Sequence, residues 1–153
     1  MSYSLDTSGI LDMWSRDYPP DVFPTIWGNM DAAAKSGGIW IVEEVVRELE
    51  RKEDGIHSWV KQREMAIVPI DDAVKTHLAE IMKKHGRLVD TRKNKSGGDP
   101  WVIALARARG LTVVTGENPT GTLTRPKIPD VCKDLGIPCI AVIDFFRKQG
   151  WRV

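Results

Sequence analysis

The sequence predicts an α/β fold: a three-layer α/β/α sandwich with a mainly parallel central sheet. Short apolar runs alternate with longer amphipathic stretches along the whole chain, as in chains that wind helices around a parallel sheet. The runs are rich in β-branched residues and lack an alternating polar face, which is typical of strands buried on both sides. The 153 residues contain no repeat and no low-complexity tract, so we expect one domain spanning residues 1–153.

Glycine and proline mark the boundaries of the expected elements. Pro19-Pro20 interrupts the first helical stretch, and Gly37-Gly38 ends the next one. Between such breaks, apolar residues recur at helical spacing or in short runs. The first half is expected to contain, in order, a strand from Tyr3 to Leu5, a brief helix capped by Thr7 or Ser8 and extending through Met13, a helix from Val22 to Ala34, a strand from Ile39 to Val42 and a charged helix through Glu48 and Leu49.

The strongest local signal lies between Gly97 and Glu117. Asp99 followed by Pro100 predicts a helix start, and Gly110 predicts its end. The run after Gly110 then predicts a short buried strand. The other expected elements are a helix from His57 to Met65, an extended piece from Ile67 to Ile70, a helix from Asp71 to Lys84, a helix from Ile128 to Gly136, a strand within Pro138 to Ile143 and a helix from Asp144 to Gln149.

Composition argues against several classes of function. Lys and Arg total 22 against 21 Asp and Glu, so net charge indicates no particular partner. The spacing of Cys132 and Cys139 matches neither a CxxC redox pair nor a zinc knuckle, and we expect reduced thiols and a cytoplasmic location. No apolar run approaches the roughly 18 residues of a membrane span. The sequence also lacks a P-loop and a GxGxxG fingerprint.

Carboxylates from distant segments supply the candidate chemistry. Asp6 and Glu117 follow predicted strands, Asp99 and Asp130 lie in first turns of helices, and Glu48 lies beside an apolar helix seam. Parallel connectivity brings such ends to one edge of the sheet. Carboxylates that converge without histidines or thiolates favour Mg²⁺ or Mn²⁺, and such ions activate water and bind phosphoryl oxygens.

Each carboxylate also has a purely structural interpretation. Asp99 and Asp130 are in positions where acidic residues often cap helices or complement the helix dipole. Glu48 taken alone is one more solvated residue on a charged helix, and Glu117 lies in a polar loop. Asp6 is harder to explain in this way, because a carboxylate that ends a buried strand needs a partner or water. Only the combination of residues points to a site.

Four motifs together resemble the PIN domain. They are Leu5-Asp6-Thr7-Ser8 after the first strand, the strand and helix from Ile39 to Glu48-Leu49, Asp99-x-x-Val102-Ile103-Ala104-x-Ala106, and Val113-Val114-Thr115-Gly116-Glu117. The closing run from Lys127 through Phe145 to Gly150 is similar to the PIN-like DUF4411 group of bacterial and archaeal proteins. The resemblance covers essentially the whole chain, with the motifs in the right order.

The resemblance implies a metal-dependent ribonuclease, often the toxin of a toxin-antitoxin pair. Asp6, Glu48, Asp99 and Glu117 would be the catalytic carboxylates, with Asp6, Asp99 and Glu117 as ligands of Mg²⁺ or Mn²⁺. An aspartate usually stands at the position of Glu117 in PIN domains, so Asp130 is a further candidate ligand that complements or replaces it. RNA is the expected substrate, and a cognate antitoxin and a homodimer are both compatible with the family.

Substrate contacts are expected from basic, hydroxyl and aromatic side chains. The basic stretch from Lys83 to Lys95, with Arg125 and Lys127, can neutralise phosphates, although a solvated loop explains such a run equally well. Trp101 lies two residues beyond Asp99 and can contact a base. The expected substrate-binding residues are Thr7, Ser8, Thr115, Lys93, Lys95 and Trp101.

Two rival functions remain open on the sequence alone. In one, the fold is PIN-like but catalysis is lost, and the protein binds RNA or a partner protein without cleaving it. In the other, the acidic crevice hydrolyses a small phosphomonoester. Three results distinguish these two functions from the ribonuclease. Metal-dependent cleavage of RNA indicates the ribonuclease, tight RNA binding without turnover indicates the binding module, and activity on an aryl phosphate but not on RNA indicates the phosphohydrolase.

Overall fold

A five-stranded, all-parallel sheet forms the centre of the molecule. The computed structural model describes residues 1–88 and 99–153. The strand order is β3-β2-β1-β4-β5, and each neighbouring pair runs parallel. This arrangement confirms the predicted fold class. The strands are β1 (Tyr3–Leu5), β2 (Ile39–Val42), β3 (Ile67–Val68), β4 (Thr112–Thr115) and β5 (Cys139–Ala141).

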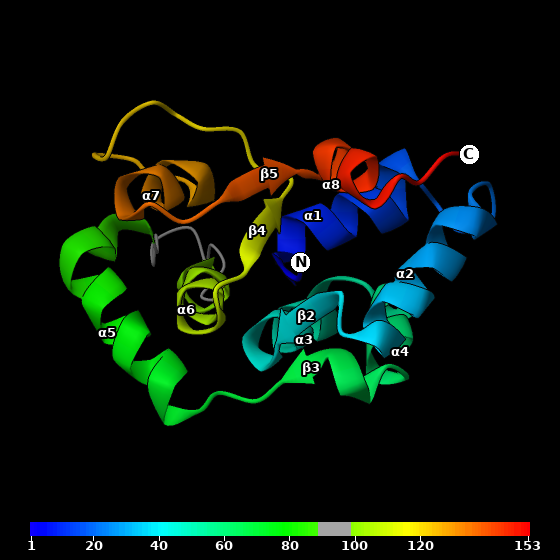
Figure 1. Cartoon of the computed structure of the whole chain (residues 1–153), viewed down its shortest axis with the longest axis horizontal. Helices are drawn as coiled ribbons and strands as arrows, with labels where there is room; N and C mark the ends of the chain where they lie inside the picture. Colours follow the sequence, from blue (N-terminus) through cyan, green and yellow to red (C-terminus); the bar gives the residue numbers. More distant parts are fainter. Residues whose placement is uncertain (89–98) are drawn as a thin grey trace.

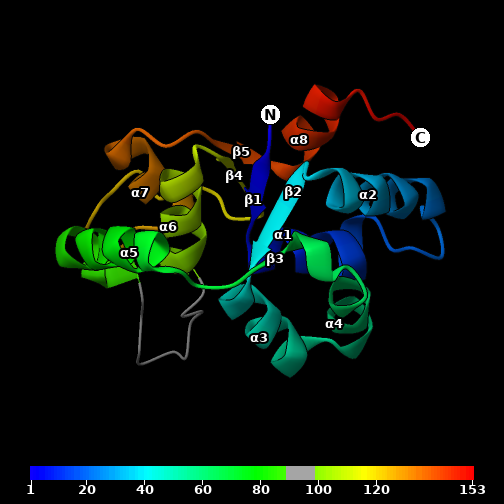
Figure 2. The ribbon, with the colours of Figure 1, turned by 60° about the horizontal axis from the view of Figure 1, so that its bottom comes forward.

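Helices cover both faces of the sheet, as Figures 1 and 2 show. One layer contains α5 (Asp72–His85), α6 (Asp99–Arg109) and α7 (Ile128–Leu135). The other contains α1 (Thr7–Asp12), its π-helical continuation η1 (Met13–Asp17), α2 (Pro24–Ser36) and α8 (Val142–Gln149). Beyond the end of β2 lie α3 (Glu43–Lys52) and α4 (Asp54–Lys61), and the short 3₁₀ turns are η2 (Glu64–Ala66) and η3 (Gly86–Leu88).

The central strand β1 contacts both helical layers through alternate residues. The ring of Tyr3 packs edge-on against Phe145 of α8, with centroids 4.8 Å apart. On the opposite face, the hydroxyl of Ser4 donates to the carbonyl of Val102 in α6 at 3.0 Å. All three residues of β1 are buried. A strand covered on both sides has no polar face, which explains the continuous apolar runs in the sequence.

Several helix boundaries differ from the predicted ones. Asp6, rather than Thr7 or Ser8, caps α1, because its carboxylate accepts from the amide of Gly9 at 2.7 Å. The helix then continues through η1 instead of ending near Met13. Val22 does not join the apolar stripe of α2: it lies before the first helical residue and is 63% exposed.

The two cysteines and three of the tryptophans lie in or against the core. Cys132 is buried and Cys139 is half-buried, and both are free thiols. Trp27 is buried, while Trp40 and Trp59 are half-buried against the core. Across residues 1–88 and 99–153, the structure contains no helix with the length and apolar character of a membrane span.

The order of the strands creates a switch point beside β1. This strand pairs with β2 on one side and with β4 on the other, although β4 follows β2 and β3 in the chain. In open parallel sheets, ligands bind at the carboxyl ends of the strands at such a point. Asp6 follows β1 and Gly116 follows β4, so both lie at this position.

Two glycines allow α1 to approach the end of β4 closely. A Cβ atom on Gly9 would lie 3.1 Å from Oδ1 of Asp6 and 3.4 Å from the amide nitrogen of Gly116. A Cβ atom on Gly116 would lie 2.7 Å from Oδ2 of Asp12 and 3.2 Å from backbone atoms of Ser8. The carboxylate of Asp12 can rotate away, but the backbone of Ser8 cannot move without shifting α1.

We therefore expect Gly116→Ala to destabilise the fold. Overpacking at Ser8 should lower the free energy of unfolding by about 1 to 3 kcal/mol. Gly28→Ala is the matched control, because no atom lies within 4 Å of its added methyl group and it lies within α2. That control should stabilise the protein by about 0.5 to 1 kcal/mol. Urea unfolding measures both, and equal effects would contradict the close approach of α1 to β4.

Candidate active site

Asp6 is the most constrained carboxylate at the switch point. It is only 1% exposed, and donors from two elements bind it. The hydroxyl of Thr115, at the end of β4, donates to Oδ2 at 2.6 Å. The amide of Gly9 donates to Oδ1 at 2.7 Å, and the hydroxyl of Ser8 lies 3.0 and 3.1 Å from the two oxygens. The side chain thereby links β1, α1 and β4.

Burial and a neighbouring carboxylate raise the pKa of Asp6. Loss of solvation is the largest cause, and the hydrogen bonds from Thr115, Gly9 and Ser8 offset it only in part. The negative charge of Glu117 raises the pKa further, and the result is a pKa of about 6. The charged form of this group is therefore costly in the protein alone, and a nearby positive charge would stabilise it.

A short chain of hydrogen bonds connects Asp6 to the segment after β4. The amide of Gly116 donates to the hydroxyl of Ser8 at 3.2 Å, and the amide of Glu117 donates to the hydroxyl of Thr115 at 3.0 Å. Both hydroxyls in turn donate to Asp6. The structure thus brings together four of the residues that the sequence singled out: Asp6, Ser8, Thr115 and Glu117.

Glu48 and Asp99 enter from two helices that contact each other. Glu48 lies in α3 and is 2% exposed, so its interpretation as a solvated surface residue is wrong. Asp99 opens α6 and is half-buried. Because α6 leads directly into β4 and packs across β1, its first turn lies toward the carboxyl edge of the sheet. Helix α3 contacts both α1 and α6 at that edge.

Glu117 and Asp130 hold the loop between β4 and α7. Oε2 of Glu117 accepts from the amide of Ile128 at 3.0 Å, at the start of α7. Asp130 accepts from the amides of Thr120, Gly121 and Lys127 at 2.8 to 2.9 Å, and from the hydroxyl of Thr120 at 2.9 Å. These bonds account for the position of Asp130 as a loop anchor. Its role as a metal ligand stays a prediction.

The hydrogen bonds on Asp130 also govern its protonation. Burial acts to raise its pKa, but the donors from Lys127, Thr120 and Gly121 more than offset this effect. The pKa falls from 3.8 to about 2. Asp130 is therefore charged at neutral pH and accepts these hydrogen bonds as a carboxylate.

The remaining predicted substrate contacts are only partly described. Thr7 is 3% exposed, and its hydroxyl makes no hydrogen bond with any residue that the structure describes. Trp101 is half-buried and packs against the core. Lys93 and Lys95 lie outside the described residues. Of the predicted basic stretch, Lys84 forms an ion pair with Asp134 at 2.9 Å.

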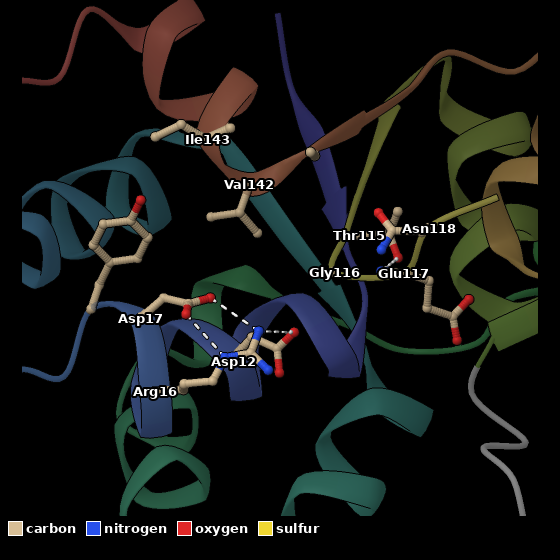
Figure 3. A pocket seen from close by; sticks show the side chains of 11 residues that line it. Asp12, Arg16, Asp17, Thr115, Gly116, Glu117, Asn118, Val142 and Ile143 are labelled. Carbon is tan, nitrogen blue, oxygen red and sulfur yellow. Dashed lines mark hydrogen bonds and ion pairs between the residues drawn. The ribbon is translucent and has the colours of Figure 1, made fainter.

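A pocket beside Asp6 contains residues that sequence reasoning missed. It has a volume of about 200 Å³ and lies between α1 and η1, the segment after β4, and the start of α8 (Figure 3). Asp12 and Arg16 line it and form an ion pair at 3.2 Å. In the sequence, the i, i+4 spacing of these opposite charges could have predicted the ion pair on one face of a helix.

The described residues do not by themselves form a metal centre. Within residues 1–88 and 99–153, no group of three or more His, Cys, Asp and Glu side chains is arranged to hold an ion. The geometry shows a buried carboxylate at the switch point with a second carboxylate close enough to raise its pKa. The metal site stays a prediction.

Comparison with known proteins identifies the family. The family model described as a domain of unknown function, DUF4411, matches residues 3–153. The chain belongs to the DUF4411 family. No curated protein matches this DUF4411 chain.

The DUF4411 chain also resembles a solved structure. It matches the crystal structure of FitAcB from Neisseria gonorrhoeae with a TM-score of 0.52 and 17% sequence identity. The match covers 92% of this chain and 96% of that chain. At this level of identity the likeness concerns the fold alone. Together with the parallel sheet, it supports the PIN-like three-layer sandwich that the sequence predicts.

We expect Asp130→Asn to weaken the protein in a pH-dependent way. The pKa shift from 3.8 to about 2 corresponds to about 2 kcal/mol of unfolding free energy at pH 7. Because the folded-state pKa is lowered, this contribution is present above about pH 4 and is lost as the pH falls toward 2. Urea unfolding in EDTA at several pH values measures it.

The control for this prediction is Asp144→Asn. Asp144 lies in the first turn of α8 with its side chain 48% exposed, and it is paired with Arg147 at 3.0 Å. Its replacement should change the stability by no more than about 0.5 kcal/mol. If Asp130→Asn behaves like this control at pH 7, the loop does not depend on the charge of Asp130.

Proposed function

We propose that this DUF4411 protein is a metal-dependent ribonuclease that hydrolyses RNA phosphodiester bonds. The observation that carries the proposal is the buried carboxylate of Asp6 at the switch point, where Thr115 binds it and Glu117 raises its pKa. Glu48 and Asp99 belong to helices that meet at the same edge. This combination of fold, edge and acidic residues is the one that the PIN resemblance implies.

The donor chemistry at this edge suits Mg²⁺ or Mn²⁺. Hard divalent cations prefer carboxylate oxygens, and a cation beside Asp6 would offset both its lost solvation and its repulsion by Glu117. Asp6, Asp99 and Glu117 would hold the ion, with Asp130 as the further candidate. When bound, such an ion lowers the pKa of water and stabilises charge on phosphoryl oxygens.

The protein's own side chains have distinct roles in this proposal. Asp6 and Asp99 would bind the divalent ion and set its position. Glu48 orients the attacking water in line with the scissile phosphorus, and Thr115 fixes the carboxylate of Asp6. Burial of Glu48 and Asp6 strengthens their electrostatic effect, because charges interact more strongly away from bulk water.

The proposed partners follow from the chemistry and from the family resemblance. Arg125 and Lys127 are exposed on the loop between Glu117 and α7, where they can neutralise RNA phosphates. Lys93 and Lys95 are proposed to do the same. As in many PIN domains, the ribonuclease would be the toxin of a toxin-antitoxin pair, and an antitoxin would cover the acidic edge. A homodimer and a cytoplasmic location stay predictions.

A PIN-like module that binds RNA without cutting it is the second candidate. The hydrogen bonds on Asp6 favour it, because Thr115, Gly9 and Ser8 already bind both carboxylate oxygens. In that case Asp6 would be a structural link between β1 and β4.

The direct test is cleavage of a labelled, mixed-sequence single-stranded RNA by the purified full chain. We expect cleavage with Mn²⁺ or Mg²⁺ and none in EDTA. Asp6→Asn and Asp99→Asn should each reduce the rate by more than about 100-fold, since even residues behind metal ligands affect activity by 10- to 100-fold. Asp72→Asn is the matched control, because Asp72 is an exposed acid in the first turn of α5.

Each alternative outcome has a distinct interpretation. RNA binding without metal-dependent turnover would establish the binding module. Hydrolysis of an aryl phosphate but not of RNA would indicate a phosphohydrolase. If Asp6→Asn and Asp99→Asn remain folded by circular dichroism and cut like the wild type, the carboxylates are not the site.

A second prediction concerns Thr115 as a positioning residue. Thr115→Val keeps the shape of the side chain but removes the hydroxyl that donates to Asp6 at 2.6 Å. We expect about a 10- to 100-fold loss of RNA cleavage, a higher metal concentration for half-maximal activity, and recovery of most activity in Thr115→Ser. An unchanged metal dependence in Thr115→Val would contradict this role.

A further inference from the structure

The pocket beside the candidate active site has one apolar and one polar wall. Val142 and Ile143, at the start of α8, lie on one side (Figure 3). Ile143 is 44% exposed, so its side chain is accessible to a ligand in the pocket. Asp12, Arg16 and Asp17 lie on the opposite side, on α1 and η1. A ligand for such a pocket needs apolar faces and a polar rim.

The polar wall is already organised. Nε and Nη2 of Arg16 lie 3.0 and 3.2 Å from the two oxygens of Asp17, and Nη2 lies 3.2 Å from Oδ2 of Asp12. Among the described residues, nothing binds Nη1 of Arg16, Oδ1 of Asp12 or the side-chain amide of Asn118. These groups leave donors and an acceptor available on a rim whose charged side chains are joined by ion pairs.

The charge of the pocket disfavours a phosphate. Three carboxylates, from Asp12, Asp17 and Glu117, line it together with the single cation Arg16. An anion would meet net negative charge, whereas a neutral ligand that donates a hydrogen bond would pair with a carboxylate. The volume of about 200 Å³ is smaller than the roughly 300 to 1,000 Å³ of sites for drug-sized ligands, and it suits one flat heterocycle.

We propose that this pocket binds one nucleobase of the RNA substrate and favours bases that carry an exocyclic amino group. The base would lie against Val142 and Ile143 and donate its amino hydrogens to Asp12, while Arg16 and Asn118 contact its carbonyl or ring nitrogen. Single-stranded RNA is recognised in this way, through splayed bases that make hydrogen bonds along their edges. This proposal rests on the proposed ribonuclease function in one respect: the base that binds here is part of the RNA substrate.

The pocket adjoins the catalytic carboxylates through a shared residue. Thr115 lines the pocket and also donates its hydroxyl to Asp6. A base held here belongs to a nucleotide next to the scissile phosphate. The pocket therefore sets a sequence preference at one position beside the cut.

Cytidine and uridine provide a matched pair of probes. They have the same size, but cytosine presents an amino donor and an N3 acceptor where uracil presents a carbonyl oxygen and an N3–H donor. In the proposed pose cytosine therefore pairs with Asp12 and Arg16, whereas uracil faces Asp12 with an acceptor and Arg16 with a donor. We expect cytidine to bind about 10-fold more tightly than uridine, the order of discrimination that one good base contact provides. Titration of ¹⁵N-labelled full-length protein, followed by NMR, measures both affinities and places the binding site. This measurement needs neither metal nor cleavage.

The same pair tests specificity in the reaction. Two RNAs that differ by one C or U beside the cut should show about a 10-fold difference in kcat/KM. Asp12→Asn is nearly isosteric and replaces an accepting oxygen with a donating amide, so the preference should fall to about 1 or reverse. Asp144→Asn is the matched control, because Asp144 pairs with Arg147 on its own helix as Asp12 does with Arg16.

The outcomes separate this proposal from the ribonuclease function. If no RNA is cut but cytidine shifts the resonances of the pocket and Asp12→Asn abolishes the preference, the base site stands and the nuclease assignment fails. If RNA is cut but neither nucleoside binds at the pocket, the base site is overturned and the nuclease stands. Equal affinities for the two nucleosides, or a preference unchanged in Asp12→Asn, also overturn it.

Discussion

The hydrogen bonds of the Asp6 carboxylate link β1, α1 and β4 at the centre of the molecule. Asp6 ends β1, caps α1 through Gly9, and accepts the hydroxyl of Thr115 from the end of β4. Without these donors a carboxylate that is 1% exposed would be very costly. These hydrogen bonds offset the cost only in part, because the pKa of Asp6 is still raised to about 6. The same buried carboxylate thus links the elements at the switch point and supplies the metal-binding group proposed there.

The loop after β4 extends this arrangement toward solvent. Glu117 is close enough to Asp6 to raise the pKa of Asp6, and its carboxylate accepts from the first amide of α7. Asp130 accepts hydrogen bonds from the loop amides of Thr120, Gly121 and Lys127. The position of Glu117 near Asp6 therefore depends on α7 and on Asp130.

Local signals in the sequence predicted the fold well, and long-range contacts account for what they missed. The sheet, the start of α6 at Asp99 and the convergence of strand ends follow from apolar runs, capping residues and parallel connectivity. The burial of Glu48 could not be predicted, because it depends on how α3 packs against other elements, among them α1 and α6. The ion pair of Asp12 with Arg16 was missed because the helix was expected to reach only Met13, whereas it continues through η1, which contains Arg16 and forms one wall of the pocket.

The most direct test of the central claim is where a divalent cation binds. Crystals of the full chain soaked in Mn²⁺ would locate the ion by its anomalous scattering. We expect a peak at the carboxyl edge of the sheet, beside the carboxylate of Asp6, and its loss in Asp6→Asn crystals. A peak only at surface acids away from β1 and β4, or no peak at saturating Mn²⁺, would contradict a metal-dependent site at this edge.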